Sequence, residues 1–316
     1  MLSRIAESLF WIGRYLERAE DTSRILDVHL NLLVEDPAVD EESACRSLIA
    51  VMGGGEPEEH PDRAAVMREL GYDRSSANSI AAAIESARES ARRARETVSS
   101  DMWSAINTTW NGVAAGRLQH GRPGASLAWA RERVALINGI AESTMSRDEG
   151  YHFMLLGRSI ERADMVARLV AATSMSAGPT TAWNTTLRAC GAHEAFLRTY
   201  RGLETEREAG EFLLLDRLFP RSIVHALSLA EECLHNLDAT GQRSGFDGEA
   251  SRLLGRARAE LEYRPLMDIL ADLPEEMERV QQTCSQASDA VTETYFAGAV
   301  ATAWVGGGGL IGGAVS

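Results

Sequence analysis

Lysine is absent from this sequence of 316 residues, so all 32 basic residues are arginine. Without lysine the chain cannot form a side-chain Schiff base, use a lysine general base or build a GxxxxGK[ST] phosphate loop. Acidic residues number 46, which gives a net charge of −14 and a pI of about 5.0. An acidic chain repels phosphate backbones, so we expect no nucleic acid among its partners.

Cysteine is scarce, and its spacing excludes the common cysteine frameworks. Cys45, Cys190, Cys233 and Cys284 lie far apart with no CxxC pair, which argues against a disulfide scaffold or a thiolate zinc site and fits a reduced compartment. Charges interrupt the apolar N-terminal segment, which therefore does not resemble a signal peptide. We expect a cytoplasmic protein.

Long hydrophobic runs are also missing. Residues 295–316 carry no charge, but they are rich in glycine and only weakly apolar, unlike the roughly 20 strongly apolar residues of a membrane span. We expect residues 297–316 to form a flexible glycine-rich tail, and we expect no membrane partner.

Proline is rare, with 8 residues, and apolar residues recur at spacings of three and four. This pattern predicts an all-α fold, a multi-helix bundle without significant β-sheet. No linker divides the chain, so residues 1–296 are expected to form a single domain. The expected helices cover residues 4–34, 42–52, 62–71, 77–110, 125–145, 147–174, 182–200, 205–217, 221–237, 248–262 and 275–296. A capping box of Ser146 and Glu149 is expected to open the helix at residue 147.

The chain resembles itself at an offset of 144 residues. Residues 9–26 read LFWIGRYLERAEDTSRIL and residues 153–170 read FMLLGRSIERADMVARLV. The identical positions are Gly13/Gly157, Arg14/Arg158, Glu17/Glu161, Arg18/Arg162, Ala19/Ala163 and Arg24/Arg168. This repeat predicts two pseudo-repeated halves, of about residues 1–145 and 146–296.

The charged residues of the repeat form the main candidate site. Both helices are apolar on nearly every face, so their charged side chains should be buried and paired between the copies. We call these residues the Arg/Glu cluster: Arg14, Glu17, Arg18, Arg158, Glu161 and Arg162. They could form a structural ion-pair network, or a pocket in which the arginines bind an anion and Glu17 or Glu161 acts catalytically. The sequence leaves both interpretations open.

The doubled G-R-x-x-E-R-A motif resembles the bacterial Alpha-E family, named for its helices and its ER motif. The resemblance extends through residues 87–103, 147–164, 183–200 and 219–223, and covers residues 1–296. It implies an all-α domain without an established activity. It also implies a role in peptide synthesis or peptide modification, with an ATP-grasp-type ligase and a transglutaminase-like protease as expected partners. The charged segment 87–96 reads as a solvated, salt-bridged face. Arg88 and Arg92, which match the family's arginine-bearing motif, could instead reach the Arg/Glu cluster, and both alternatives stay open.

Two E-x-x-H pairs, Glu149/His152 and Glu232/His235, have the spacing seen in di-iron helical bundles. Such pairs arise by chance in a chain rich in glutamate, so we expect no metal and no cofactor. Three functions stay open: a binding or scaffold module, an enzyme that uses the Arg/Glu cluster on a peptide or carboxylate, and a di-metal bundle. A homo-oligomer is also compatible with the sequence.

Overall fold

The computed structural model describes residues 1–37, 39–53, 60–174, 179–201, 205–238 and 248–296. It is all-α, as expected, and no strand occurs in these ranges. The helices are α1 (Ser3–Glu35), α2 (Glu41–Val51), α3 (Arg63–Val66), α4 (Ile80–Arg93), α5 (Ser100–Ala114), α6 (Pro123–Thr144), α7 (Glu149–Ser174), α8 (Pro179–Ala189), α9 (His193–Tyr200), α10 (Glu206–Leu215), α11 (Ile223–Leu237), α12 (Glu249–Tyr263), α13 (Leu266–Ala271) and α14 (Leu273–Tyr295). α3 continues as a π-helical turn over Met67–Tyr72. The expected tail, residues 297–316, lies outside the described residues.

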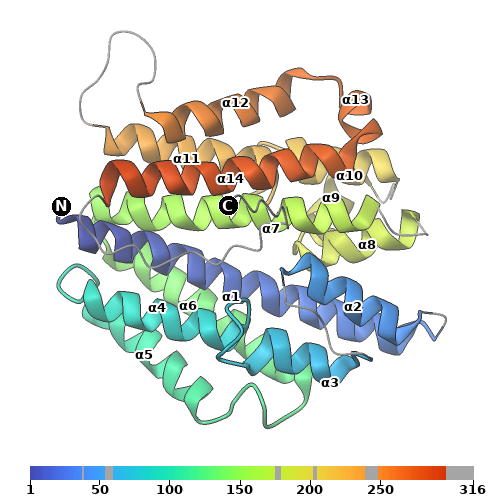
Figure 1. Cartoon of the computed structure of the whole chain (residues 1–316), viewed down its shortest axis with the longest axis horizontal. Helices are drawn as coiled ribbons and strands as arrows, with labels where there is room; N and C mark the ends of the chain where they lie inside the picture. The colour runs from blue at the N-terminus through green and yellow to red at the C-terminus, as the bar shows by residue number, and fades with distance from the viewer. Residues whose placement is uncertain (38, 54–59, 175–178, 202–204, 239–247, 297–316) are drawn as a thin grey trace, which may run out of the picture.

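Helices α1 and α7 form the centre of the bundle (Figure 1). On one side α1 packs against α4 and α6, and on the other α7 packs against α11 and α14. α5 and α12 form the outer layers, and α2 and α8 lie at the end of the bundle where α1 and α7 finish. This arrangement buries both central helices because each has apolar side chains on nearly all of its faces.

Glycine brings the backbones of α1 and α7 into direct contact. A Cβ placed on Gly13 would lie 2.0 Å from the carbonyl oxygen of Met154, and one placed on Gly157 would lie 2.1 Å from that of Phe10. No side chain larger than a hydrogen atom fits at either position without a shift of backbone. The two repeated glycines therefore set the spacing of the central helices.

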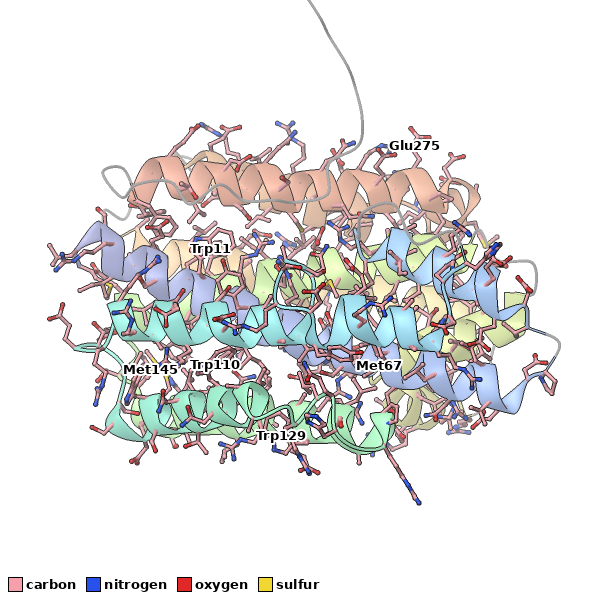
Figure 2. The ribbon with its side chains drawn as sticks, turned by 60° about the horizontal axis from the view of Figure 1, so that its bottom comes forward. Trp11, Met67, Trp110, Trp129, Met145 and Glu275 are labelled. Atoms are coloured by element: carbon pink, nitrogen blue, oxygen red, sulfur yellow. The ribbon has the colours of Figure 1, made fainter. Side chains whose placement is uncertain are left out.

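Tryptophans pack at several levels of the bundle. Figure 2 shows Trp11 between α14 and α4, and Trp110 on the other side of α4, towards α5. Trp183 of α8 is buried, while Trp103 and Trp110 are half-buried against the core. Among the helices that the structure describes, none is both long and apolar enough to span a bilayer.

Two helices expected to be continuous are each broken, so those two predictions are wrong. The segment 77–110 divides into α4 and α5 because the hydroxyl of Ser99 accepts the backbone N–H of Met102 at 3.1 Å and starts a new helix. The segment 182–200 divides into α8 and α9 at Gly191, which has a φ of 63°. The short helix α13 was not expected from the sequence.

The capping box expected at the start of α7 is also wrong. Asp148 occupies the cap, because its Oδ1 accepts the backbone N–H groups of Gly150 at 3.0 Å and Tyr151 at 3.2 Å. Glu149 instead forms an ion pair with the amino group of Met1 at 2.9 Å. The helix thus begins two residues later than expected.

The candidate Arg/Glu site

Glu17 of α1 is fully buried and contacts two arginines. Arg162 of α7 donates from Nε to Oε1 at 2.6 Å and from Nη2 to Oε2 at 2.8 Å. Arg221, which lies just before α11, places its Nη1 3.0 Å from Oε1 of the same carboxylate. Arg162 also donates to the carbonyl oxygen of Pro220 at 3.2 Å. The carboxylate thus joins α1, α7 and the segment before α11 through ion pairs, of which the one with Arg162 is also doubly hydrogen-bonded.

Glu161 of α7 has the matching environment. Arg14 donates from Nε to Oε2 at 2.7 Å, and Arg18 donates from Nε to Oε1 at 2.6 Å. Arg14 is only 1% exposed, and its Nη1 donates to the hydroxyl of Ser288 on α14. Helix α14 is therefore connected to α1 through a buried guanidinium.

The contacts of the two repeated segments are reciprocal. Arg18 pairs with Glu161 in one direction, and Arg162 pairs with Glu17 in the other. One pair departs from this symmetry. Arg14 bonds to Glu161, but the Nε of its counterpart Arg158 is buried and donates to no described residue. Arg221 occupies the position beside Glu17 that symmetry would give to Arg158.

Arg221 is the centre of a second group of carboxylates on α1. Its guanidinium bonds to Asp21 and, at 2.8 Å, to Glu20, in addition to Glu17. Glu20 also accepts from Arg24 at 2.8 Å. Three carboxylates therefore share one buried cation, and Oδ2 of Asp21 accepts no hydrogen bond from any residue in the described ranges.

The carboxylates of the site differ in the direction in which their pKa values are shifted. Burial opposes ionisation of both cluster glutamates, but Arg162 and Arg221 beside Glu17, and Arg18 and Arg14 beside Glu161, lower each pKa to about 2. Asp21 behaves in the opposite way. Burial and the neighbouring Glu17 and Glu20 raise its pKa to about 7, against the attraction of Arg221. At neutral pH both cluster glutamates are ionised and Asp21 is titrating.

The raised pKa of Asp21 predicts an unusual pH dependence. An acid with a higher pKa in the folded protein binds its proton more tightly there, so its contribution to stability is lost as the pH rises from about 4 to about 7. We expect the Asp21→Asn variant, which keeps an oxygen for Arg221, to lack this loss. Between pH 4.5 and 7.5 the free energy of unfolding should fall by about 1–3 kcal/mol more in the wild type than in the variant.

Urea unfolding at pH 4.5, 6.0 and 7.5 measures this difference. Equal slopes for the two proteins would contradict the assignment of Asp21. Below pH 4.5 the sign reverses for both proteins, because Glu17 and Glu161 have lowered pKa values and their contribution to stability is lost as the pH falls towards 2.

Arg88 and Arg92 do not reach the Arg/Glu cluster, so that alternative is wrong and the salt-bridged face is the one observed. Arg88 donates to Asn107 at 2.9 Å and to Glu89 at 2.6 Å, and Arg92 donates to Glu89 at 2.9 Å. They lie on the side of α4 that faces α5 and the solvent. Helical periodicity places them there, because the face of α4 that packs on α1 is formed by alanine and isoleucine.

The E-x-x-H pairs do not form a metal centre. Glu149 pairs with the Met1 amine, and Glu232 and His235 lie on the exposed face of α11. Among the described residues no three histidine, cysteine or acidic side chains converge as metal ligands. The convergence that the di-metal hypothesis requires is not found.

Two openings in the described surface lie away from the cluster. One, of about 480 Å³, is polar and lies where the α4–α5 and α6–α7 connections meet. The other, of about 740 Å³, is mainly apolar and lies between α1, α2, α7 and α8. We call this second opening the apolar groove. The described residues that line the two openings include no member of the Arg/Glu cluster.

Comparison with known proteins identifies the family of this bundle. A family model, described as "a predicted alpha-helical domain with a conserved ER motif", matches residues 1–296. The chain belongs to the Alpha-E family. Uncharacterised proteins of Mycobacterium bovis and Mycobacterium tuberculosis are each 25% identical to it over 330 aligned residues. The alignments cover 93% of this Alpha-E chain but only 37% of each relative. No solved structure gives a significant match.

Sequence reasoning missed two important members of the site. Arg221 lies in residues 219–223, a segment of the family resemblance, but nothing in the sequence shows that it faces Glu17 and Asp21. Ser288 was not singled out. In both cases the partner is about 200 or more residues away along the chain. The sequence predicted distant pairs only between the two copies of the repeated motif.

Proposed function

We propose that this Alpha-E domain is a non-catalytic binding or scaffold module of a bacterial peptide-synthesis or peptide-modification system. We further propose that it works in the cytoplasm with an ATP-grasp-type ligase. The observation that carries the first proposal is the closed state of the Arg/Glu cluster. Each glutamate is at most 1% exposed and each is held by two arginines. A carboxylate with a pKa of about 2 is a poor general base at neutral pH.

The cysteines support the same conclusion. All four are buried free thiols, and burial raises the pKa of Cys45 to about 11 and those of Cys190 and Cys233 to about 12. Burial also raises the pKa of Cys284. A thiol in this state is not ionised at neutral pH and does not act as a nucleophile.

The proposed partner rests on the family context and on the length of the relatives. Alpha-E domains are expected beside ATP-grasp-type ligases. About 63% of each curated relative lies outside the matched region, since only 37% of each is matched. A unit of this size within longer chains fits a module that holds other components in place.

We also infer that residues 1–145 and 146–296 are related halves. The reciprocal contacts of α1 and α7 support this inference, as do the matching Ser-Ile starts of α4 and α11.

An enzyme remains the second candidate because of Arg158. That function needs an arginine without its full set of partners, and the buried Nε of Arg158 lacks one among the described residues. It also needs an open pocket beside the cluster, and neither described opening is lined by a cluster residue.

The test combines the full chain with the ATP-grasp-type ligase encoded nearest to it. Sedimentation velocity should show a complex with a dissociation constant of about 10 μM or tighter. The chain alone should not turn over ATP or peptides. A ligase from an unrelated pathway is the control. No association at about 100 μM would contradict the scaffold proposal, and turnover by the chain alone that is lost in Glu17→Gln or Glu161→Gln would establish the enzyme instead.

A further inference from the structure

The apolar groove has the dimensions of a binding site. Its volume of about 740 Å³ lies within the range of 300–1,000 Å³ that is usual for ligand pockets. Its floor follows α1 from Ile25 to Leu32 and α2 from Ser43 to Val51. Each of these stretches is about two helical turns, or roughly 12 Å long. Leu169 of α7 and Ala182 of α8 line the side of the groove that faces α2.

The surface of the groove is apolar but incompletely covered. Val28, Leu32, Ala44, Leu169 and Ala182 are all only half-buried. Apolar side chains left partly open along two turns of facing helices provide the contacts that an added helix makes with residues spaced three and four apart. Within the described part of the chain, these apolar side chains of the groove are therefore only partly covered.

Charge around the groove is negative. The described lining contains two carboxylates, Asp36 and Asp40, and no arginine. His29, which also lines it, is uncharged at neutral pH because burial lowers its pKa to about 4. Glu35 is exposed beside the lining at the end of α1. A partner that covers this groove gains electrostatically if it carries positive charge.

We propose that the apolar groove binds a basic amphipathic helix of a partner chain, with leucine-like side chains in the groove and arginine or lysine against Glu35 and Asp40. This inference rests on the proposed binding function and names the surface that performs it. The described lining of the groove contains neither arginine nor lysine, so the positive side of the contact comes from the helix that binds there.

The test uses three synthetic 18-residue peptides with the same leucine positions and with arginine, glutamine or glutamate at all polar positions. Fluorescence anisotropy with the full chain should show the arginine peptide binding at least about 10-fold more tightly than the glutamine peptide, and the glutamate peptide not binding. Equal binding of the arginine and glutamine peptides would overturn the proposal, because an uncharged segment would then satisfy the groove.

Variants separate groove binding from general attraction to an acidic protein. Ala44→Trp and Ala182→Trp fill the groove from opposite walls and should each weaken the arginine peptide at least about 10-fold. Ala50→Trp is the matched control, since Ala50 is on α2, exposed and outside the lining. If both filled variants fold and bind as the wild type does, the peptide binds elsewhere and the proposal is wrong.

Rim variants test the charges. Asp40→Asn keeps a side-chain acceptor for the backbone N–H of Ser43, which Asp40 caps at 2.9 Å, and removes the charge. Together with Glu35→Gln it should weaken the arginine peptide about 3- to 10-fold and reduce the salt dependence of binding. Glu132→Gln on the exposed face of α6 should have no effect. If Glu132→Gln weakens binding of the arginine peptide as much as Asp40→Asn with Glu35→Gln does, the proposal is contradicted.

Measurements with the ligase distinguish the two proposals. If Ala44→Trp abolishes peptide binding but not ligase binding, the groove serves another basic helix and the scaffold proposal stands. If the ligase does not bind at all while the arginine peptide binds in the groove, the ligase partner is wrong and the groove assignment stands.

Discussion

Replacement of Glu161 by glutamine is expected to destabilise the protein by roughly 3–5 kcal/mol, because it leaves Arg14 and Arg18 without their carboxylate. The change preserves the shape of the side chain and removes only its charge. Arg14 is the more affected of the two arginines, since it is 1% exposed and its other hydrogen bond is to the neutral hydroxyl of Ser288. Chemical unfolding monitored by circular dichroism at pH 7.5 measures the change.

Glu17→Gln should lower the free energy of unfolding less than Glu161→Gln does, although it removes an equally buried carboxylate. Arg221 keeps Glu20 and Asp21 as partners, so only Arg162 loses its single carboxylate. Glu35→Gln, at an exposed position, is the control and should cost about 0.5 kcal/mol or less. Costs of both cluster variants no larger than that of the control would show that the network does not hold the bundle together.

Alanine at Gly13 or Gly157 is expected to destabilise the protein by roughly 2–4 kcal/mol, which is large for the addition of one methyl group. The new Cβ would lie about 2 Å from a backbone carbonyl oxygen of the facing helix, so α1 and α7 must separate by more than 1 Å. Separation would also lengthen the ion pairs across the same seam. Thermal and urea unfolding of each variant measure the cost.

Gly139→Ala is the matched control for the glycine variants. Gly139 lies inside α6, where an added Cβ meets no atom within 4 Å. Because alanine favours a helix over glycine, this variant should be stabilised by about 0.5–1 kcal/mol. Equal effects of alanine at positions 13, 157 and 139 would contradict the backbone contact between α1 and α7.

The sequence was sufficient to predict that the fold is all-α and that α1 and α7 are paired helices. Spacings of three and four identified α1 and α7 to within two residues, and the repeat at an offset of 144 indicated which charged residues face each other. These features are visible because they depend on local periodicity and on residues that occur twice.

Breaks within helices were harder to find because no proline or paired glycine marks them. α4 ends before Ser99 in a run without either residue, and the single Gly191 ends α8 inside an otherwise helical pattern. The sequence left the placement of Arg92 open because an arginine-rich segment has the same composition whether it faces a buried cluster or solvent. Asp27 of α1 is half-buried and pairs with Arg131 at 2.9 Å, although nothing in the sequence links the two residues. Partners of this kind depend on tertiary packing, which a single sequence does not encode locally.

The exchange of arginines between α1 and α7 has a consequence during synthesis on the ribosome. At about 5–20 residues per second, α7 is made roughly 10–30 s after α1. During that interval Glu17 has neither Arg162 nor Arg221, and the glycine seam of α1 has no opposing backbone. The nascent chain therefore leaves the side of α1 that packs on α7 uncovered until its second half has left the ribosome. A chain that stops near residue 145 can still pack α1 against α4 and α6, but the side of α1 that faces α7 has no partner, which makes such a chain a substrate for chaperones and proteases.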